Sequence, residues 1–420
     1  MNSLRKKTSL AGISFSVFLF FSISLAFPTG YSYGALGMLI FSLIGYEILD
    51  IKKIDFDSKV LAGLLFLMGG VWGLSFDGLF GVSGTDYWLK YYLALFCLCV
   101  ISRCGVVSGA VIWGCAVGAL GALGIATYQF FVLNIHKATG FTNAIQYGGI
   151  AMYLGWATWC FAFFAGYSTR YSMLLWLAGA AGVSASLFSG TRGAWIVAPL
   201  LLIIIFIIAF KYCKNKLLVI SLSLFFIFSS SILLINSERI ASRINSANIE
   251  FNAYLSNPVE NASSSIGQRL EQWTLAWKLG AEKPFFGWGI QGFVDAKEKM
   301  IEGGLAHPSV KDYGHAHNEI LDMFAKRGLF GVAVLLMFYA VPLAIFWPTT
   351  QRIQLMKPRQ KEIGLALRAA ASLLPIAYFG FGWTQVFFAH NSGHMFYVFS
   401  LVAFLGAIRY LEGKADLFKN

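Results

Sequence analysis

Long apolar runs separated by short polar connections make up most of the chain. A helix that crosses a bilayer needs about 20 residues, and the runs reach this length together with their flanking aromatic residues. The runs lie at residues 10–27, 31–49, 60–76, 88–101, 104–133, 144–166, 171–188, 194–210, 217–235, 319–347, 369–388 and 395–411. This pattern predicts an all-α, polytopic integral membrane protein with about 12 transmembrane helices.

Residues 236–318 interrupt this pattern with a long and mostly polar stretch. The chain is therefore expected to have three parts. Residues 1–235 would hold the first nine transmembrane helices, residues 236–318 a large loop with amphipathic helices, and residues 319–420 the last three transmembrane helices.

Composition supports a membrane protein. The chain is 57% hydrophobic and 12% charged, whereas soluble domains carry about 25% charged residues. The net charge of +12 could suggest a nucleic-acid partner, but the charges lie between apolar runs rather than on one face, so we expect none. The six cysteines show no Cys–His spacing typical of a metal site.

Lysine and arginine residues mark alternate connections and both termini. These segments hold 19 of the 32 basic residues, the opposite short connections hold only Lys90, Lys137 and Arg192, and the other 10 lie in or beside the long loop. Basic short loops stay in the cytoplasm. Both termini are thus expected in the cytoplasm of a bacterium, with the 236–318 loop in the periplasm and the N-terminal run retained as the first helix of an inner-membrane protein.

All six histidines fall on the predicted periplasmic side. Histidine is the side chain best suited to move protons near neutral pH, so this side is the expected working face. The residues are His136, His307, His315, His317, His390 and His394.

A first candidate motif is Ser-Gly-Thr-Arg-Gly-Ala-Trp at residues 189–195, in a predicted tight turn between two helices. Its two glycines permit a sharp turn and a close approach. Arg192 would lie at the membrane boundary, where its planar guanidinium suits a phosphate or pyrophosphate. The alternative is an interfacial arginine that reaches toward lipid headgroups.

A second motif, Gln-Arg-Leu-Glu-Gln-Trp at 268–273, continues into Pro-Phe-Phe-Gly-Trp-Gly at 284–289. Leu270, Trp273, Ala276 and Trp277 follow helical spacing, which predicts an amphipathic helix laid on the bundle or the membrane interface and ended by the proline. Arg269 lies near the start of this helix. It could bind an anion, or it could pair with Glu271 or a lipid headgroup.

A third motif is Gly-His-Ala-His-Asn-Glu-Ile-Leu-Asp-Met at 314–323, followed by Gly-Leu-Phe-Gly at 328–331. Positions i and i+2 of a helix do not share a face, so one pocket is not expected to use both histidines. A single histidine acting as base, oriented by Glu319 or Asp322, needs fewer assumptions. A zinc pair lacks a third ligand at suitable spacing, so we expect no metal.

Two polar turns, at 139–148 with Asn143 and at 390–394 with His390, are either ordinary turns or parts of the same site. The chain carries no phosphate-binding lysine motif and no dinucleotide-binding glycine pattern, so we expect no cofactor. A periplasmic site has no ATP or nucleotide sugar. A transferase there would have to take its donor from a lipid carrier activated by phosphate.

The three motifs, in this order on one predicted face, resemble those of the O-antigen ligases, within the superfamily of O-antigen polymerase and ligase membrane proteins. The similarity covers most of the chain in topology. It implies a GT-C-like membrane fold with a large helical periplasmic loop. The stretch around Asn143 resembles the ligase branch more than the polymerase branch or the protein-directed oligosaccharyltransferases.

The resemblance implies transfer of an O-polysaccharide from undecaprenyl diphosphate to a sugar hydroxyl of lipid A–core among the membrane lipids, by metal-independent, inverting glycosyl transfer. Arg192 and Arg269 would bind the diphosphate. His317, which matches the position of the essential histidine in the motif, would be the base, although His315 lies only two residues away. Supporting positions would be Glu319, Asn318, His315, His390 and Asn143.

Two other functions remain open at this point. An O-antigen polymerase would use the same donor and a lipid-linked glycan as acceptor. A flippase or transporter of lipid-linked sugars would need charges at mid-membrane, and the central parts of the predicted spans hold almost none.

Overall fold

The computed structural model describes residues 3–75, 84–213, 238–354 and 356–413. Within these ranges every regular element is helical. The long apolar helices are α1 (Ser3–Ile23), α2 (Gly30–Ile44), α3 (Phe56–Gly73), α4 (Thr85–Cys104), α5 (Ser108–Thr127), α6 (Ala144–Phe164), α7 (Thr169–Phe188), α8 (Arg192–Tyr212), α14 (Glu319–Phe346), α16 (Lys361–Phe381) and α17 (Asn391–Leu411). The polar helices are α10 (Glu238–Ser256), α11 (Pro258–Asn261), α12 (Ser265–Glu282) and α13 (Gly289–Glu302).

Nine helices of the described residues are long and apolar enough to cross a membrane, as expected for a polytopic membrane protein. The helix α2 has 15 residues and is shorter than the others. The predicted span at 217–235 lies outside the described residues, so the total of about 12 stays a prediction. Each of the other predicted spans overlaps one of the long apolar helices.

One predicted boundary is wrong in a way that matters for the site. The run at 369–388 was expected to be a span, but α16 extends from Lys361 to Phe381 and is followed by a loop at 382–390. The sequence misleads because the loop itself is apolar at Val386, Phe387 and Phe388, which are all buried. Arg368, one of the 19 basic residues that were expected in connections or at the termini, lies inside this helix.

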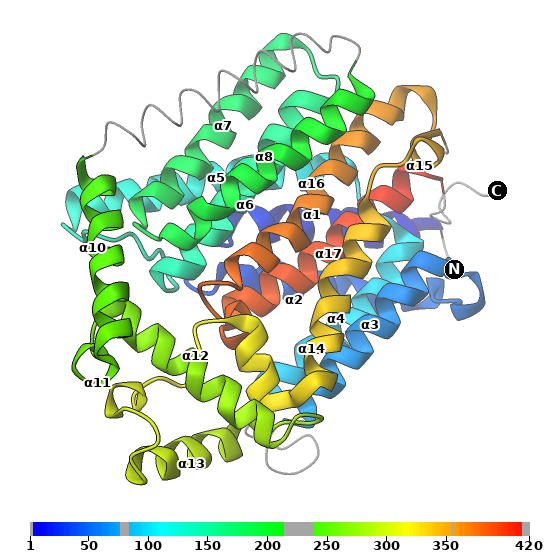
Figure 1. Ribbon diagram of the computed structural model, residues 1–420. Helices are drawn as coiled ribbons and strands as arrows, with labels where there is room; N and C mark the ends of the chain where they lie inside the picture. The colour runs from blue at the N-terminus through cyan, green and yellow to red at the C-terminus, as the bar shows by residue number, and fades with distance from the viewer. Residues whose placement is uncertain (1–2, 76–83, 214–237, 355, 414–420) are drawn as a thin grey trace.

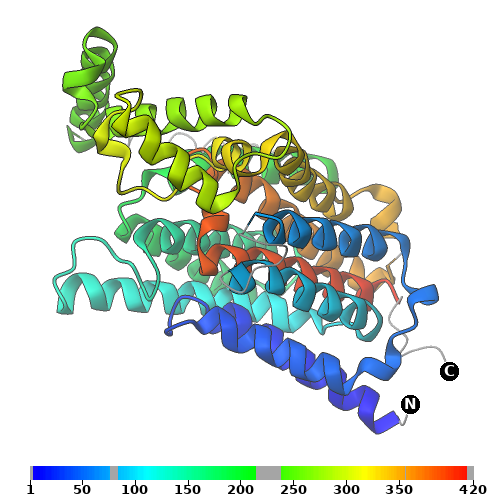
Figure 2. The same cartoon turned by 90° about the horizontal axis from the view of Figure 1, so that it is seen from below.

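The helices α16 and α17 form the centre of the bundle. Almost all of α17 is buried, and α16 packs against α6, α8 and α14. Small residues allow close approach elsewhere: a Cβ at Gly155 of α6 would lie 2.8 Å from the carbonyl oxygen of Gly179 in α7. Figures 1 and 2 show α10–α13 gathered at one end of the bundle, whereas the two termini lie at the opposite end.

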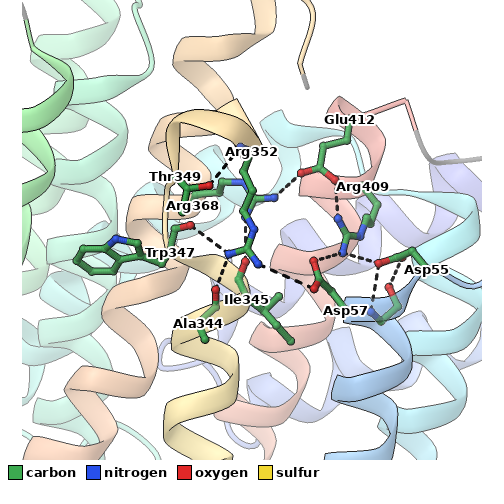
Figure 3. A network of polar contacts seen from close by, with 11 residues as sticks. Asp55, Asp57, Ala344, Ile345, Trp347, Thr349, Arg352, Arg368, Arg409 and Glu412 are labelled. Atoms are coloured by element: carbon green, nitrogen blue, oxygen red, sulfur yellow. Dashed lines mark hydrogen bonds and ion pairs between the residues drawn. The ribbon is translucent and has the colours of Figure 1, made fainter. Parts of the chain in front are cut away.

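A buried ion network holds the end of the bundle near the termini (Figure 3). Arg409 of α17 donates to Asp55 and Asp57 at the start of α3, at 2.5 and 2.8 Å, and to Glu412 at 2.5 Å. Glu412 also accepts from Arg368 of α16. Two arginines that the sequence analysis counted as topology markers are therefore buried members of an ion network that joins three helices.

Candidate active site

The loop that carries His315 and His317 is fixed to the first turn of α14. Asn318 caps the helix, because its Oδ1 accepts from the backbone N–H groups of Ile320 and Leu321, each at 3.1 Å. Asp322 accepts from the backbone N–H of Ala316 at 3.0 Å. His317 itself has a φ of 50°, a left-handed backbone conformation that non-glycine residues seldom adopt. The loop is therefore folded back so that both histidine rings face the same space.

The His317 ring contacts Gln385, a residue that the sequence analysis did not identify. Its Nδ1 lies 2.7 Å from Oε1 of Gln385. The expected orienting residues have other partners: Asp322 binds Ala316 and Lys326, and Glu319 binds the backbone of the 382–390 loop. The prediction that Glu319 or Asp322 contacts the ring is wrong.

Glu319 instead positions the loop that carries Gln385. Its backbone N–H donates to the carbonyl oxygen of Gly382 at 2.8 Å, and its Oε2 accepts from the backbone N–H of Phe388 at 3.1 Å. Both ends of the loop are thus tied to the first residue of α14. His317 lies two residues before Glu319. The backbone and carboxylate contacts of Glu319 therefore fix the loop that carries Gln385 relative to His317.

His315, His390 and Asn143 complete the cluster. The rings of His315 and His317 have centroids 4.4 Å apart, and those of His315 and His390 are 5.8 Å apart. The two rings lie close together because both residues precede α14, so the helical spacing rule, from which we expected only one of them in the pocket, does not apply to them. Asn143 caps α6 through Oδ1 and places Nδ2 3.4 Å from Nδ1 of His390.

The other three histidines do not join this cluster. His307 accepts from the backbone N–H of Ser309 at 3.1 Å and caps a short turn. His394 lies within α17, fully buried, with Nδ1 2.9 Å from the hydroxyl of Tyr91. His136 is exposed in the connection after α5.

Arg192 is the first residue of α8, at the turn predicted from the first motif. Gly190 has a φ of 66° in this turn. A Cβ at Gly193 would lie 2.2 Å from Oγ1 of Thr384, so the start of α8 packs directly against the 382–390 loop. The Arg192 side chain is exposed at the same end of the bundle as the histidine cluster.

Arg269 lies on α12, which packs against α14 (Figure 1). Burial lowers the pKa of Arg269, and the positive charge of Arg192 lowers it further. In the part of the chain that the structure describes, neither guanidinium pairs with a carboxylate. Glu271, the expected alternative partner of Arg269, accepts from Tyr254 at 2.7 Å. Two unneutralised arginines from different helices therefore lie within electrostatic reach of each other.

The second and third motifs join α12 to α14 through their backbones. Gly328 breaks α14 with a φ of 64°. The N–H groups of the next two residues, Leu329 and Phe330, donate to the carbonyl oxygens of Pro284 and Phe285 at 2.7 and 3.2 Å. As predicted, α12 ends just before Pro284. This joint fixes the helix that carries Arg269 relative to the helix that follows His317.

The buried face of α12 matches the predicted one only in part. Leu275, Ala276 and Leu279 are buried, whereas Trp277 is 60% exposed. The helix packs through its aliphatic residues onto α13 and α14, and Trp277 contacts only the edge of that interface, with its ring 5.5 Å from that of Phe324.

Burial keeps the three clustered histidines neutral. It lowers the pKa of His315 to about 4, and it also lowers the pKa values of His317 and His390. The hydrogen bond that His317 donates to Gln385 raises the pKa of His317, and the charge of Arg269 lowers it. The charge of Arg192 thus acts on Arg269 and that of Arg269 acts on His317. Guanidinium groups can bind an anion, and a neutral imidazole can accept a proton.

Among the residues that the structure describes, no three His, Cys, Asp or Glu side chains are arranged to hold a metal ion.

Comparison with known proteins identifies the same part of the chain. Residues 174–336 match the family described as O-antigen ligase, and this range contains Arg192, Arg269 and His317. The chain is also 27% identical over 411 residues to an uncharacterized protein of Haemophilus influenzae, covering 94% of this chain and 97% of the relative. The match at residues 174–336 supports the resemblance to the superfamily of O-antigen ligases and polymerases.

Proposed function

We propose that the protein is an O-antigen ligase, which transfers O-polysaccharide from undecaprenyl diphosphate to a sugar hydroxyl of lipid A–core. The observation that supports this proposal is an electrostatic link between three groups: the charge of Arg192 acts on Arg269, and the charge of Arg269 acts on the neutral imidazole of His317. Neither arginine pairs with a carboxylate among the described residues. A lipid diphosphate needs concentrated positive charge at the membrane surface, and an attacking hydroxyl needs a base.

The proposed reaction is a single displacement. The acceptor hydroxyl oxygen forms a bond to the anomeric carbon, and the bond from that carbon to the diphosphate oxygen breaks with its electron pair. The hydroxyl proton passes to His317 and then to water. Attack opposite the leaving group inverts the anomeric centre.

The arginines would act mainly on the leaving group. Negative charge grows on the diphosphate as the bond breaks, and fixed guanidinium groups stabilise this charge where water competes poorly. The arginines can supply the electrostatic stabilisation that a divalent ion supplies elsewhere, so the proposed reaction is metal-independent.

An O-antigen polymerase is the second candidate, because it would use the same donor and the same leaving-group chemistry. A strain that lacks the chain distinguishes the two. Loss of a ligase leaves lipopolysaccharide without any O-chain, whereas loss of a polymerase leaves a single repeat. Finding one repeat on the lipopolysaccharide of the deletion strain would overturn the ligase proposal.

We also propose that the site faces the periplasm of the bacterial inner membrane and that both termini are cytoplasmic. The distribution of basic residues supports this orientation. A cysteine at Ser263, which is exposed near the start of α12, should react with a membrane-impermeant maleimide in intact cells. Protection of this cysteine, in a background without the six native cysteines, would contradict the orientation.

A further inference from the structure

Gln385 is the polar side chain in direct contact with the His317 ring. It is 4% exposed, and its Oε1 lies 2.7 Å from Nδ1 of His317. We propose that Gln385 is the positioning residue of the base: its amide oxygen holds the proton of His317 on Nδ1, so that Nε2 carries the lone pair that accepts the hydroxyl proton. This inference rests on the proposed role of His317.

The chemistry of the contact sets the tautomer. An amide oxygen can only accept a hydrogen bond, so the ring nitrogen that faces it must carry the hydrogen. A neutral imidazole has one N–H and one lone pair, and the lone pair of His317 is therefore on Nε2. When Nε2 takes a proton, the Nδ1–H bond to Gln385 becomes charge-assisted and stronger. Gln385 itself exchanges no proton.

His390 and Asn143 lie behind the amide. Nε2 of Gln385 is 3.4 Å from Nε2 of His390, and Nδ1 of His390 is 3.4 Å from Nδ2 of Asn143. A neutral His390 can accept from only one of these amides at a time. Because the contact to His317 is much shorter, at 2.7 Å, it sets the orientation of the Gln385 amide, and His390 accepts from the amide's N–H side.

The loop gives Gln385 little freedom to move away. Glu319 binds the backbone at Gly382 and Phe388, on both sides of Gln385. Gly193 at the start of α8 packs against the neighbouring Thr384. The loop that carries the amide is thus held by α14 and α8. A positioning group requires such a rigid support.

The titratable and charged groups around His317 come from four segments. They are Tyr313 and His315 on its own loop, Asp322 and Lys326 on α14, Arg269 on α12, and His390 on the 382–390 loop. The carboxylate of Asp322 is bound to Lys326 and to the backbone of Ala316. A change at Gln385 therefore acts on the ring more directly than a change at any of these groups.

The test uses the full chain in detergent and measures the titration of His317 without relying on transfer. Diethyl pyrocarbonate acylates neutral imidazole, and mass spectrometry of the peptide gives the modification rate of His317 as a function of pH. Gln385→Glu places a carboxylate charge beside Nδ1 of His317. It should raise the pH midpoint of His317 modification by about one pH unit or more. Gln385→Met keeps the shape, removes the acceptor, and should lower the midpoint.

Gln354→Glu is the matched control, because Gln354 is exposed in α15 (Thr350–Gln354), two residues after Arg352, which pairs with Asp57 of the ion network. It makes the same change of charge and should leave the midpoint unchanged. In a transfer assay Gln385→Met should lower kcat about 10- to 100-fold with little change in KM, the size of effect seen when a histidine loses its outer hydrogen-bond partner.

The outcomes separate the two proposals. Unchanged His317 midpoints in both Gln385 variants, in a chain that transfers glycan normally, would overturn the positioning role alone. Shifted midpoints in a chain that transfers no glycan would overturn the proposed function and leave the pairing of Gln385 with His317. If Gln385→Glu fails to elute as a folded protein, the direction of the shift in Gln385→Met decides the question.

Discussion

The rings of His315 and His317 pack edge to face, with their planes at 82° and their centroids 4.4 Å apart. Of these two rings, the one with a polar side chain at Nδ1 is His317, because Nδ1 of His315 is buried and has no hydrogen-bond partner among the residues that the structure describes. The two adjacent histidines therefore differ in their surroundings. His317 has an orienting group, Gln385, and His315 packs against the His317 ring.

We expect His317→Gln to lower transfer by a factor of about 10² to 10⁴, the usual contribution of a general base. His315→Gln should keep transfer within about tenfold of the wild type, because it removes packing and leaves the base in place. Transfer rates of the two purified variants at pH 7.5 provide the comparison. If the His315 variant transfers no glycan and the His317 variant remains active, His315 and not His317 is the base.

The rate should depend on pH through the neutral form of His317. Burial holds its pKa below 6.5, so the rate should be constant around pH 7 to 8 and fall only as the pH drops through the lowered pKa. The sign follows because a protonated ring cannot accept the hydroxyl proton. A log kcat/KM profile tests this, and a rate that rises toward pH 5 would argue against a histidine base.

Arg192→Ala and Arg269→Ala should each reduce transfer about 30- to 1000-fold, equivalent to about 2–4 kcal/mol for one lost bidentate contact to the diphosphate. Lysine at either position should restore the rate only in part, because it lacks the planar fork. Arg170→Ala is a suitable control, since Arg170 is exposed near the start of α7. Normal transfer by an alanine variant would make that arginine an interfacial residue.

Glu412→Gln should destabilise the folded bundle by about 3 kcal/mol, because it removes the carboxylate that Arg368 contacts, and both side chains are almost fully buried. Arg409 would keep its ion pairs with Asp55 and Asp57. Thermal unfolding in detergent measures the effect, with the exposed Glu302→Gln as control. Equal melting temperatures of the two variants would show that the network adds no stability.

The helices and the motif-borne residues could be predicted from the sequence because apolar runs and short motifs are local signals. The charge of Arg192 acts on Arg269 and that of Arg269 acts on His317, although the motifs that carry these residues are far apart in the chain. Their roles in a site stay predictions. The superfamily resemblance was confirmed by the match at residues 174–336.

The contacts within the site could not be predicted in the same way. Gln385 was hidden because the apolar residues around it gave the 382–390 loop the appearance of a span. Glu319 was expected to orient His317, but its carboxylate binds the backbone of that loop. The contact between His315 and His317 was missed because a helical spacing rule was applied to two residues that precede the helix. Each of these errors concerns tertiary contacts, which a local pattern does not encode.

The most direct test of the account is transfer by the purified full chain. The substrates are an undecaprenyl diphosphate-linked glycan and lipopolysaccharide that ends at its core, and the product is followed by gel mobility and mass. The account predicts glycan attached to lipopolysaccharide, release of undecaprenyl diphosphate, no loss of rate in EDTA, and greatly reduced transfer by Arg192→Ala, Arg269→Ala and His317→Gln. Elongation of the lipid-linked glycan without any transfer to lipopolysaccharide would contradict it.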